Sequence, residues 1–264
     1  MQKNLALILL SSSLLLTGLG YGQLTAYQKP VGISSVHTLF EYRKSNWDGT
    51  HASTVFLYVA DSGRLESFKW TEGDNTATLV TAVMDWDLFS VKSFTNHRLE
   101  TGKEPMLVAS LQADKNGQIS IEAGPYRDSM TLAGLPWQSY DFDFAGLGFT
   151  WQALRDKKAP FYIHIADAAR VNGQMAFVNK GRVDIHYAGQ EMLDTVSCYK
   201  YAIGGDGLEN RGGSIWIDPA DWMIKKYMIS LPDKPGFENG MLQLVQTRKI
   251  SPGDWEIFKR SKLR

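Results

Sequence analysis

The chain has 264 residues, of which 44% are hydrophobic, 12% aromatic and 21% charged. Its 28 basic residues balance 28 acidic ones, so no long-range field attracts the protein to nucleic acid or to an anionic membrane surface. The composition excludes a low-complexity protein. No Pro- or Ser-rich linker divides the chain, and we expect a single β-rich domain over residues 23–254.

The first 22 residues have the pattern of a secretory signal peptide. Lys3 precedes an interrupted apolar stretch over residues 5–16, and small residues surround a cleavage site between Gly22 and Gln23. A membrane anchor needs about 18 or more predominantly apolar residues, which this stretch does not supply. We therefore expect a signal peptide over residues 1–22 and an exported protein, periplasmic or extracellular, that is not transmembrane after cleavage.

The first half of the remaining chain has the pattern of β-strands. Short segments rich in β-branched and aromatic residues alternate with turn residues such as Asp61-Ser62-Gly63, which favours successive antiparallel strands. The predicted strands of this half span residues 35–44, 53–59, 64–70, 76–84, 88–94, 105–111 and 118–123.

The next predicted element is a helix over residues 141–156, with approximate bounds. Apolar side chains recur there at three- and four-residue steps, along one stripe of a helix, at Phe144, Leu147, Trp151 and Leu154. Gly146 and Gly148 each cost about 1 kcal/mol relative to alanine in a helix interior, so the helix needs a packing partner. We expect a mainly β fold, a strongly curved antiparallel sheet or half-open β-barrel wrapped around this one short aromatic helix.

Strands resume after the helix. In residues 182–187, apolar side chains alternate with polar ones, which is typical of a strand with one buried and one solvated face. Residues 255–264 form a basic C-terminal tail that we expect to be solvated and to fray. The predicted strands of this half span residues 161–165, 173–178, 182–188, 195–203, 214–217, 222–230 and 241–249.

Motifs of catalysis and metal binding are largely missing from the sequence. His164 and His186 lie on neighbouring predicted strands, but only Asp184 offers a third ligand, so we expect no metal and no cofactor. Cys198, the single cysteine, lies in an apolar strand pattern and is interpreted as a buried small residue. Two pairs of carboxylates remain as candidates for acid–base catalysis. They are Asp85 with Asp87, and Asp141 with Asp143.

The second half of the chain resembles a known family. The order of an aromatic helix (140–149), a Cys/Tyr strand (194–201), the segment Gly-Ser-Ile-Trp-Ile-Asp (213–218) and a following strand (222–227) carries the resemblance, over roughly residues 140–245. It is similar to the exported bacterial domain-of-unknown-function family 3108. That resemblance implies a relative of the periplasmic lipoprotein carriers, whose half-closed β-barrel wraps around helices, and it implies no catalytic residues.

We therefore expect a non-enzymatic cell-envelope protein that binds a hydrophobic ligand, such as a lipid or acyl chain, or a partner protein in a groove between sheet and helix. Two alternatives stay open: a carbohydrate-active hydrolase that uses Asp141 or Asp143, and a purely structural envelope assembly factor with an apolar patch on its outer surface. The residues expected to line the groove are Phe142, Phe144, Leu147, Phe149, Trp151 and Trp216.

Overall fold

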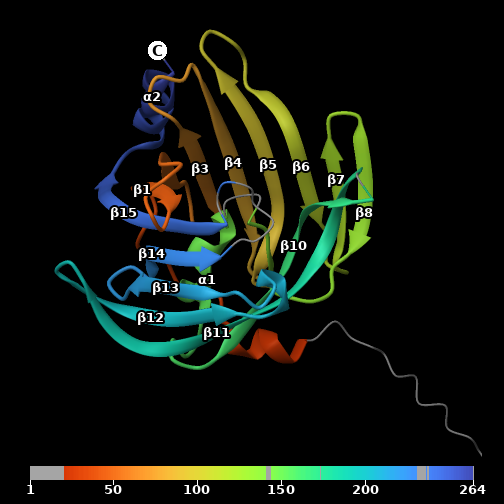
Figure 1. Cartoon of the computed structure of the whole chain (residues 1–264), viewed down its shortest axis with the longest axis vertical. Helices are drawn as coiled ribbons and strands as arrows, with labels where there is room; N and C mark the ends of the chain where they lie inside the picture. The colour runs from red at the N-terminus through yellow and green to blue at the C-terminus, as the bar shows by residue number, and fades with distance from the viewer. Residues whose placement is uncertain (1–20, 141–143, 173, 231–235, 237, 264) are drawn as a thin grey trace, which may run out of the picture.

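The computed structural model describes residues 21–140, 144–172, 174–230, 236 and 238–263. Within this part of the chain the strands form one 15-stranded sheet (Figure 1). The predicted signal peptide falls mainly on residues 1–20, which lie outside the described residues, and η1 (Tyr21–Ala26) spans its expected cleavage site.

The sheet consists of two meanders joined in its middle, where β1 pairs antiparallel with β15. The first meander runs outward from β1 to β8, and the second runs from β15 back to β9, whose two residues pair parallel with β10. The strands are β1 (Thr38–Asn46), β2 (Ser53–Val59), β3 (Arg64–Trp70), β4 (Thr76–Asp85), β5 (Ser90–Glu100), β6 (Met106–Ala113), β7 (Gln118–Ala123), β8 (Tyr126–Thr131), β9 (Trp137–Gln138), β10 (Phe161–Val171), β11 (Gln174–Leu193), β12 (Val196–Gly204), β13 (Gly213–Asp218), β14 (Met223–Ser230) and β15 (Asn239–Lys249).

The sheet is strongly curved, and the two meanders bend toward each other around α1 (Thr150–Ala153) (Figure 1). Hydrogen bonds link the two meanders: the Trp137 indole on β9 donates to the Val91 carbonyl on β5 at 3.0 Å, and the Ala133 amide, just after β8, donates to Asn179 Oδ1 on β11 at 3.0 Å. The expected mainly β fold, a curved and open sheet around a short helix, is confirmed.

Each predicted strand segment overlaps an observed strand. Segments 173–178 and 182–188 are parts of one strand, β11, because Gly181 at φ 122° lets the backbone continue through an irregularity opposite Ile165 and Ala166. The sequence patterns missed β8, whose residues are mostly exposed at the edge of the sheet, and the two-residue β9. An exposed edge strand buries neither face and so carries no apolar alternation.

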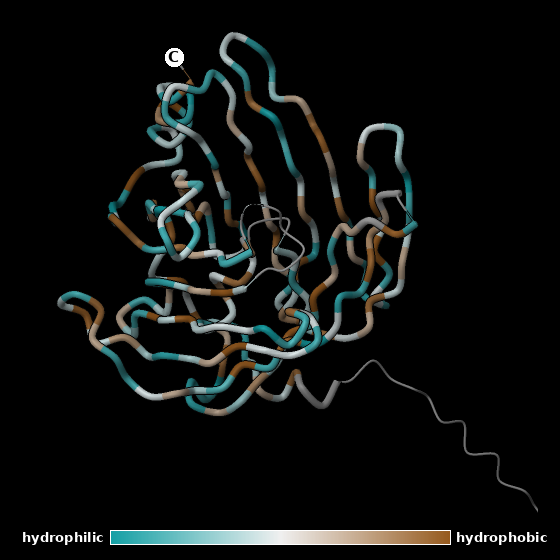
Figure 2. The backbone as a smooth tube through the Cα atoms, in the orientation of Figure 1, coloured by the Kyte–Doolittle hydropathy of each residue, from teal (hydrophilic) through white to brown (hydrophobic). Residues whose placement is uncertain are grey.

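Both faces of the first meander are apolar. Along β2, Val55, Leu57 and Val59 face the concave interior, while Phe56 and Tyr58 face a second cluster on the convex side. Figure 2 shows hydrophobic and hydrophilic residues alternating along several strands of the sheet. The convex cluster is covered by α2 (Pro252–Lys262), which lies outside the curve of the sheet (Figure 1).

Helix α2 occupies most of the segment that we expected to fray. Ser251 caps it by accepting the Asp254 amide at 3.1 Å, and Pro252 follows the cap. Trp255 is buried against the convex face, which gives the short helix the packing partner that it needs. The expectation of a solvated tail over residues 255–264 therefore does not hold for residues 255–262, which are helical. None of the helices that the structure describes has both the length and the hydrophobicity to span a lipid bilayer.

Candidate functional site

The predicted helix is shorter than expected. It consists of the 3₁₀-helix η2 (Ala145–Phe149) and the single turn α1, while Asp141, Phe142 and Asp143 lie outside the described residues. Phe144 begins the segment in a left-handed conformation (φ 49°), without a side-chain cap. We call residues 144–154 the plug. It stays short because the glycines disfavour a longer helix and α1 ends where Leu154 turns to an extended conformation.

The plug fills the concave side of the sheet. Its four predicted groove residues that the structure describes, Phe144, Leu147, Phe149 and Trp151, are each at most 4% exposed. Leu147 and Trp151 pack with the second meander, where the Trp151 ring lies 5.4 Å from that of Tyr201. Phe149 packs with the first meander. The plug therefore joins the apolar clusters of both halves of the sheet.

Trp216 does not join these residues. On β13 its neighbours Ile215 and Ile217 face the interior, so Trp216 points to the opposite, convex face. There the ammonium groups of Lys200 and Lys226 lie 5.0 and 5.6 Å from the centre of its ring. Alternation along the strand thus places Trp216 on the convex face, where it is 6% exposed, and not in the groove.

Asp167 holds the chain just before the plug. This carboxylate on β10 is fully buried, and it accepts a hydrogen bond from Ser139 Oγ at 2.5 Å and one from the Tyr140 amide at 2.8 Å. Charge-assisted hydrogen bonds of this kind are stronger than neutral ones. Asp167 therefore fixes the point where the chain leaves the sheet toward the plug.

The other end of the plug is held by the N-terminal lead-in. The Gln28 amide donates to the Ala153 carbonyl at 2.7 Å, and the Arg155 amide donates to the Ala26 carbonyl at 2.9 Å. Tyr27, opposite Leu154, is buried and stacks on Phe89 with ring centres 5.3 Å apart. The plug is thus fastened at both ends, while its centre is held by apolar packing.

The two plug glycines have different surroundings. A β-carbon at Gly146 would lie 2.5 Å from Val91 Cγ2 and 2.7 Å from Gln138 Oε1, so this position needs glycine for close approach to β5 and β9. A β-carbon at Gly148 would meet its nearest neighbours, Met223 and Leu57, at 3.4 and 3.6 Å, which are ordinary contacts. Alanine therefore fits at residue 148 and not at residue 146.

The gap that the structure describes under the plug is small. A gap of about 20 Å³, beside Phe144 and Gly148, is lined mainly by apolar side chains of the two meanders. A volume of this size holds about one water molecule, so an acyl chain enters only if the plug moves. The Tyr42 hydroxyl at the gap donates to the Ile224 carbonyl at 2.7 Å, and burial raises the pKa of this phenol well above its ordinary value.

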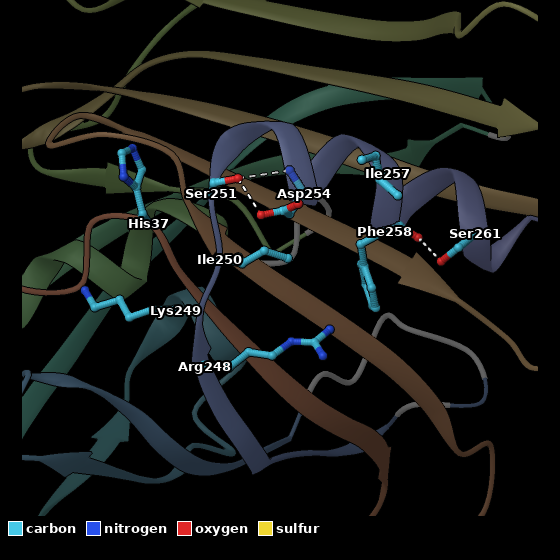
Figure 3. Close-up of a pocket in the computed structure, with 9 residues that line it drawn as sticks. All are labelled: His37, Arg248, Lys249, Ile250, Ser251, Asp254, Ile257, Phe258 and Ser261. Atoms are coloured by element: carbon cyan, nitrogen blue, oxygen red, sulfur yellow. Dashed lines mark hydrogen bonds between the residues drawn. The ribbon is translucent and has the colours of Figure 1, made fainter.

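Larger depressions lie at the surface. One of 690 Å³ lies beside the start of α2, where His37, Arg248 and Phe258 contribute to its lining (Figure 3). Its basic groups are engaged: Lys249 Nζ donates to the Ser34 and Val36 carbonyls at 2.9 Å, and the Arg248 guanidinium lies 4.8 Å from the centre of the Phe258 ring. A second depression of 470 Å³ lies at one end of strands β1–β5. These contacts of Arg248 and Lys249 indicate a structural role for the first depression.

Of the predicted carboxylate pairs, the structure describes Asp85 and Asp87. Asp85 Oδ1 accepts the Asp87 and Leu88 amides at 2.9 and 3.1 Å, which closes a turn. His164 lies opposite Arg182 rather than beside His186. In the described part of the chain, no group of three or more His, Cys, Asp or Glu side chains is arranged to hold a metal ion. The hydrolase hypothesis rests on Asp141 and Asp143, outside the described residues.

Cys198 is buried, as the sequence pattern indicated. Burial raises the pKa of its thiol from 9.0 to about 11, helped by the negative charge of Asp218. Since the thiolate is the reactive form, we expect the native protein to react negligibly with Ellman's reagent at neutral pH and to release one thiol equivalent after unfolding in guanidinium. Rapid reaction of the folded protein would show instead that this strand opens readily.

Asp221 makes stability depend on pH. Burial raises the pKa of its carboxyl above the ordinary value of 3.8, although the carboxylate accepts the Met223 amide at 2.8 Å. Because the folded pKa exceeds the unfolded one, the stabilisation is complete below the unfolded pKa and is lost as pH rises through the folded pKa. Asp221→Asn should therefore raise the urea midpoint at pH of about 7 and leave it unchanged near pH 3, where the carboxyl is protonated. An equal gain at both pH values would contradict the electrostatic explanation.

Comparisons with known proteins assign no family. No family model matches the chain, and no curated protein gives a significant match. The expected membership of family 3108 is therefore not supported. A structure described as an outer membrane lipoprotein-sorting protein domain from Vibrio parahaemolyticus shares 9% identity, covers 86% of this chain and 91% of its own, and has a TM-score of 0.22. A DUF1329 family protein from Desulfovibrio piger shares 8% identity over 88% and 93% of the two chains, with a TM-score of 0.23. Scores this low carry no argument for this chain.

Proposed function

We propose that this chain is an exported, non-enzymatic cell-envelope protein that binds the hydrocarbon part of a ligand on the concave face of its sheet, in place of the plug. The observation that carries the proposal is how this face is covered. A sheet with an apolar face normally packs against a second layer of regular structure. Here one 3₁₀ turn and one α turn, fastened at their ends, cover the centre. An acyl chain that displaces this short cover breaks fewer regular hydrogen bonds than one that displaces a packed helix or sheet.

The gap beside Gly148 gives the sharpest test. Gly148→Ala fits the surrounding contacts and fills part of the gap, so it should favour the closed plug. Substitutions of this kind at a compatible backbone stabilise a structure by about 0.4–1 kcal/mol, which weakens apparent affinity about two- to fivefold if binding requires opening. Gly32→Ala is the matched control, because a β-carbon there meets nothing within 4 Å.

The measurement is a fluorescence titration with the neutral apolar probe N-phenyl-1-naphthylamine. We expect saturable binding to the wild-type protein, weaker binding to Gly148→Ala and wild-type binding to Gly32→Ala. Absence of saturable binding to the folded wild-type protein would overturn the proposal. Equal binding by all three proteins would show that the probe binds away from the plug.

Export is tested separately. When the full-length chain is expressed in bacteria and the cells are fractionated, we expect the protein in the envelope or medium fraction, with Gln23 as its first residue by N-terminal sequencing. Recovery of the uncleaved chain from the cytosol would contradict this part of the proposal.

A structural assembly factor is the second candidate, favoured by one edge of the sheet. Met106, Leu107 and Val108 on β6 are 41–55% exposed, and β7 pairs with β6 only from Ser110 onward. Unpaired strand edges with apolar side chains accept a strand of another chain. A photo-crosslinking residue at position 107 should then capture an envelope protein, and Val108→Lys should abolish that crosslink. Crosslinking that persists in Val108→Lys would argue against this function.

A further inference from the structure

The Gln138 side chain on β9 is buried with an unpaired amide. It is 0% exposed, and within the described part of the chain neither its Oε1 atom nor its Nε2 atom has a hydrogen-bond partner. Buried polar side chains are normally hydrogen-bonded, because an amide that leaves water without a new partner destabilises the folded state. The fold alone therefore gives no reason for an amide at this position.

The plug covers this amide. A β-carbon at Gly146 would lie 2.7 Å from Gln138 Oε1 and 3.4 Å from its Nε2, so the amide lies directly against the backbone of η2. Val91 Cγ2, an apolar group, approaches the same glycine. The described residues of the plug make no hydrogen bond to the amide. Movement of η2 away from the sheet therefore uncovers a polar group that has nothing to lose.

The amide and the apolar gap lie under the same short turn. Gly146 and Gly148 are two residues apart in η2, which is about 4 Å along a 3₁₀-helix. Gly148 borders the gap, whose lining is mainly apolar, whereas Gly146 lies over Gln138. A molecule that replaces η2 therefore meets an apolar surface and one polar group close together. The hydrocarbon chain and the polar head of an amphiphile match this arrangement.

A primary amide determines which head it binds. Nε2 carries two N–H donors and Oε1 is an acceptor, so the amide bonds best to a head that offers both an acceptor and a donor. The amide has no charge to compensate an anionic head, and an unpaired charge is costly to bury. An ester with a neighbouring hydroxyl meets both conditions, because its carbonyl accepts from Nε2 and its hydroxyl donates to Oε1.

We propose that Gln138 binds the uncharged head of an acyl ester of the monoacylglycerol kind, whose hydrocarbon chain replaces the plug on the concave face. This inference rests on the proposed function for the hydrocarbon chain and adds the chemistry of the head group. The amide is unpaired in the closed protein and paired in the complex, so pairing it favours binding.

The test removes the amide and keeps the shape of the side chain. Gln138→Met retains an unbranched side chain and loses both hydrogen-bonding groups, and Gln138→Leu is a second variant without the amide. Gln246→Met is the matched control, because Gln246 is exposed on β15. Isothermal titration calorimetry measures the binding of monodecanoylglycerol, decanoate and glycerol monoacetate, each below its critical micelle concentration. Urea unfolding measures stability, and N-phenyl-1-naphthylamine again serves as the neutral probe.

We expect the wild-type protein to bind monodecanoylglycerol about tenfold more tightly than decanoate, whose charge finds no partner at the amide. Both variants at residue 138 should bind monodecanoylglycerol about tenfold more weakly, the effect of losing one or two hydrogen bonds, and should bind the neutral probe within about twofold of the wild type. The urea midpoint should rise, at least in Gln138→Met, because no unpaired amide remains in the interior. Gln246→Met should match the wild type in binding and in stability.

Three results would overturn the proposal. The first is wild-type affinity of Gln138→Met for monodecanoylglycerol. The second is an equal loss of affinity for monodecanoylglycerol and the neutral probe, which would show that Gln138 shapes the site without binding the head. The third is a lower urea midpoint in both Gln138→Met and Gln138→Leu, which would show that the amide has a partner in the native protein.

Two further outcomes separate this inference from the proposed function. Glycerol monoacetate that binds as tightly as monodecanoylglycerol would overturn the amphiphile and assign Gln138 to a small polar ester. Binding of monodecanoylglycerol that depends on Gln138, in a protein that does not bind the neutral probe, would support the head-group site and contradict the proposed function.

Discussion

Trp255→Ala should lower the free energy of unfolding by about 3–5 kcal/mol, the range for removing a buried tryptophan side chain. Trp255 is 1% exposed, and its ring stacks on Tyr58 and Phe258 with centres 5.1 and 5.6 Å away. Its indole donates to Glu66 Oε2 at 2.7 Å. The substitution therefore leaves a cavity under α2 and deprives the Glu66 carboxylate of one of its two donors, the other being Lys259 at 3.1 Å.

Urea unfolding of the full chain measures this loss. Ile257→Ala is the matched control on the same helix, because Ile257 is 67% exposed and its truncation should change stability by no more than about 0.5 kcal/mol. If Trp255→Ala were as mild as Ile257→Ala, α2 would be an appendage of the sheet and not part of its convex core.

Trp151→Ala should destabilise the protein by a similar amount, about 3–5 kcal/mol, because the plug belongs to the concave core. The Trp151 ring is fully buried and packs edge-on against Phe161 and Tyr201, with centres 5.8 and 5.4 Å away. Protein interiors are close-packed, so the residues around Trp151 cannot collapse far into the space that the indole leaves.

The resulting cavity has a second signature. Apolar cavities of this kind take up small aromatic molecules, so indole should raise the melting temperature of Trp151→Ala and leave that of the wild type unchanged. Trp47→Ala is a control at a half-exposed tryptophan, where we expect a loss of about 1 kcal/mol from its hydrogen bond to the Gly240 carbonyl. A loss at Trp151 no larger than that at Trp47 would mean that the plug is loosely packed.

Most of the strands were predictable because a strand that buries one face has a period of two in its sequence. Segments 53–59, 64–70 and 118–123 coincide with β2, β3 and β7. The plug was located but its length was overestimated. Its apolar side chains recur every three or four residues because the plug contacts both meanders. Glycine is needed at position 146 because Val91, far away in the sequence, and Gln138 approach it closely.

The sequence around residue 251 contains a local signal for the start of helix α2. Ser251, Pro252 and Asp254 have the spacing of a helix start with a capping residue, and Trp255 and Phe258 follow at helical spacing. The basic residues of this segment instead favoured the prediction of a solvated tail. Lys259 shows why charge alone misleads: it is buried, and its ammonium pairs with Glu66 at 3.1 Å and Glu256 at 2.8 Å. Its partner Glu66 lies on β3, far away in the sequence, and no local pattern indicates that pairing.

By itself the sequence determined the mainly β fold, the position of the aromatic segment and the burial of Cys198, because these depend on local periodicity and composition. The tertiary structure alone decided which residues meet. It placed Trp216 on the convex face and left a gap of about 20 Å³ beside Phe144 and Gly148. The physical reason is that strand register and sheet curvature are set by contacts between segments distant in the sequence, which local periodicity does not record.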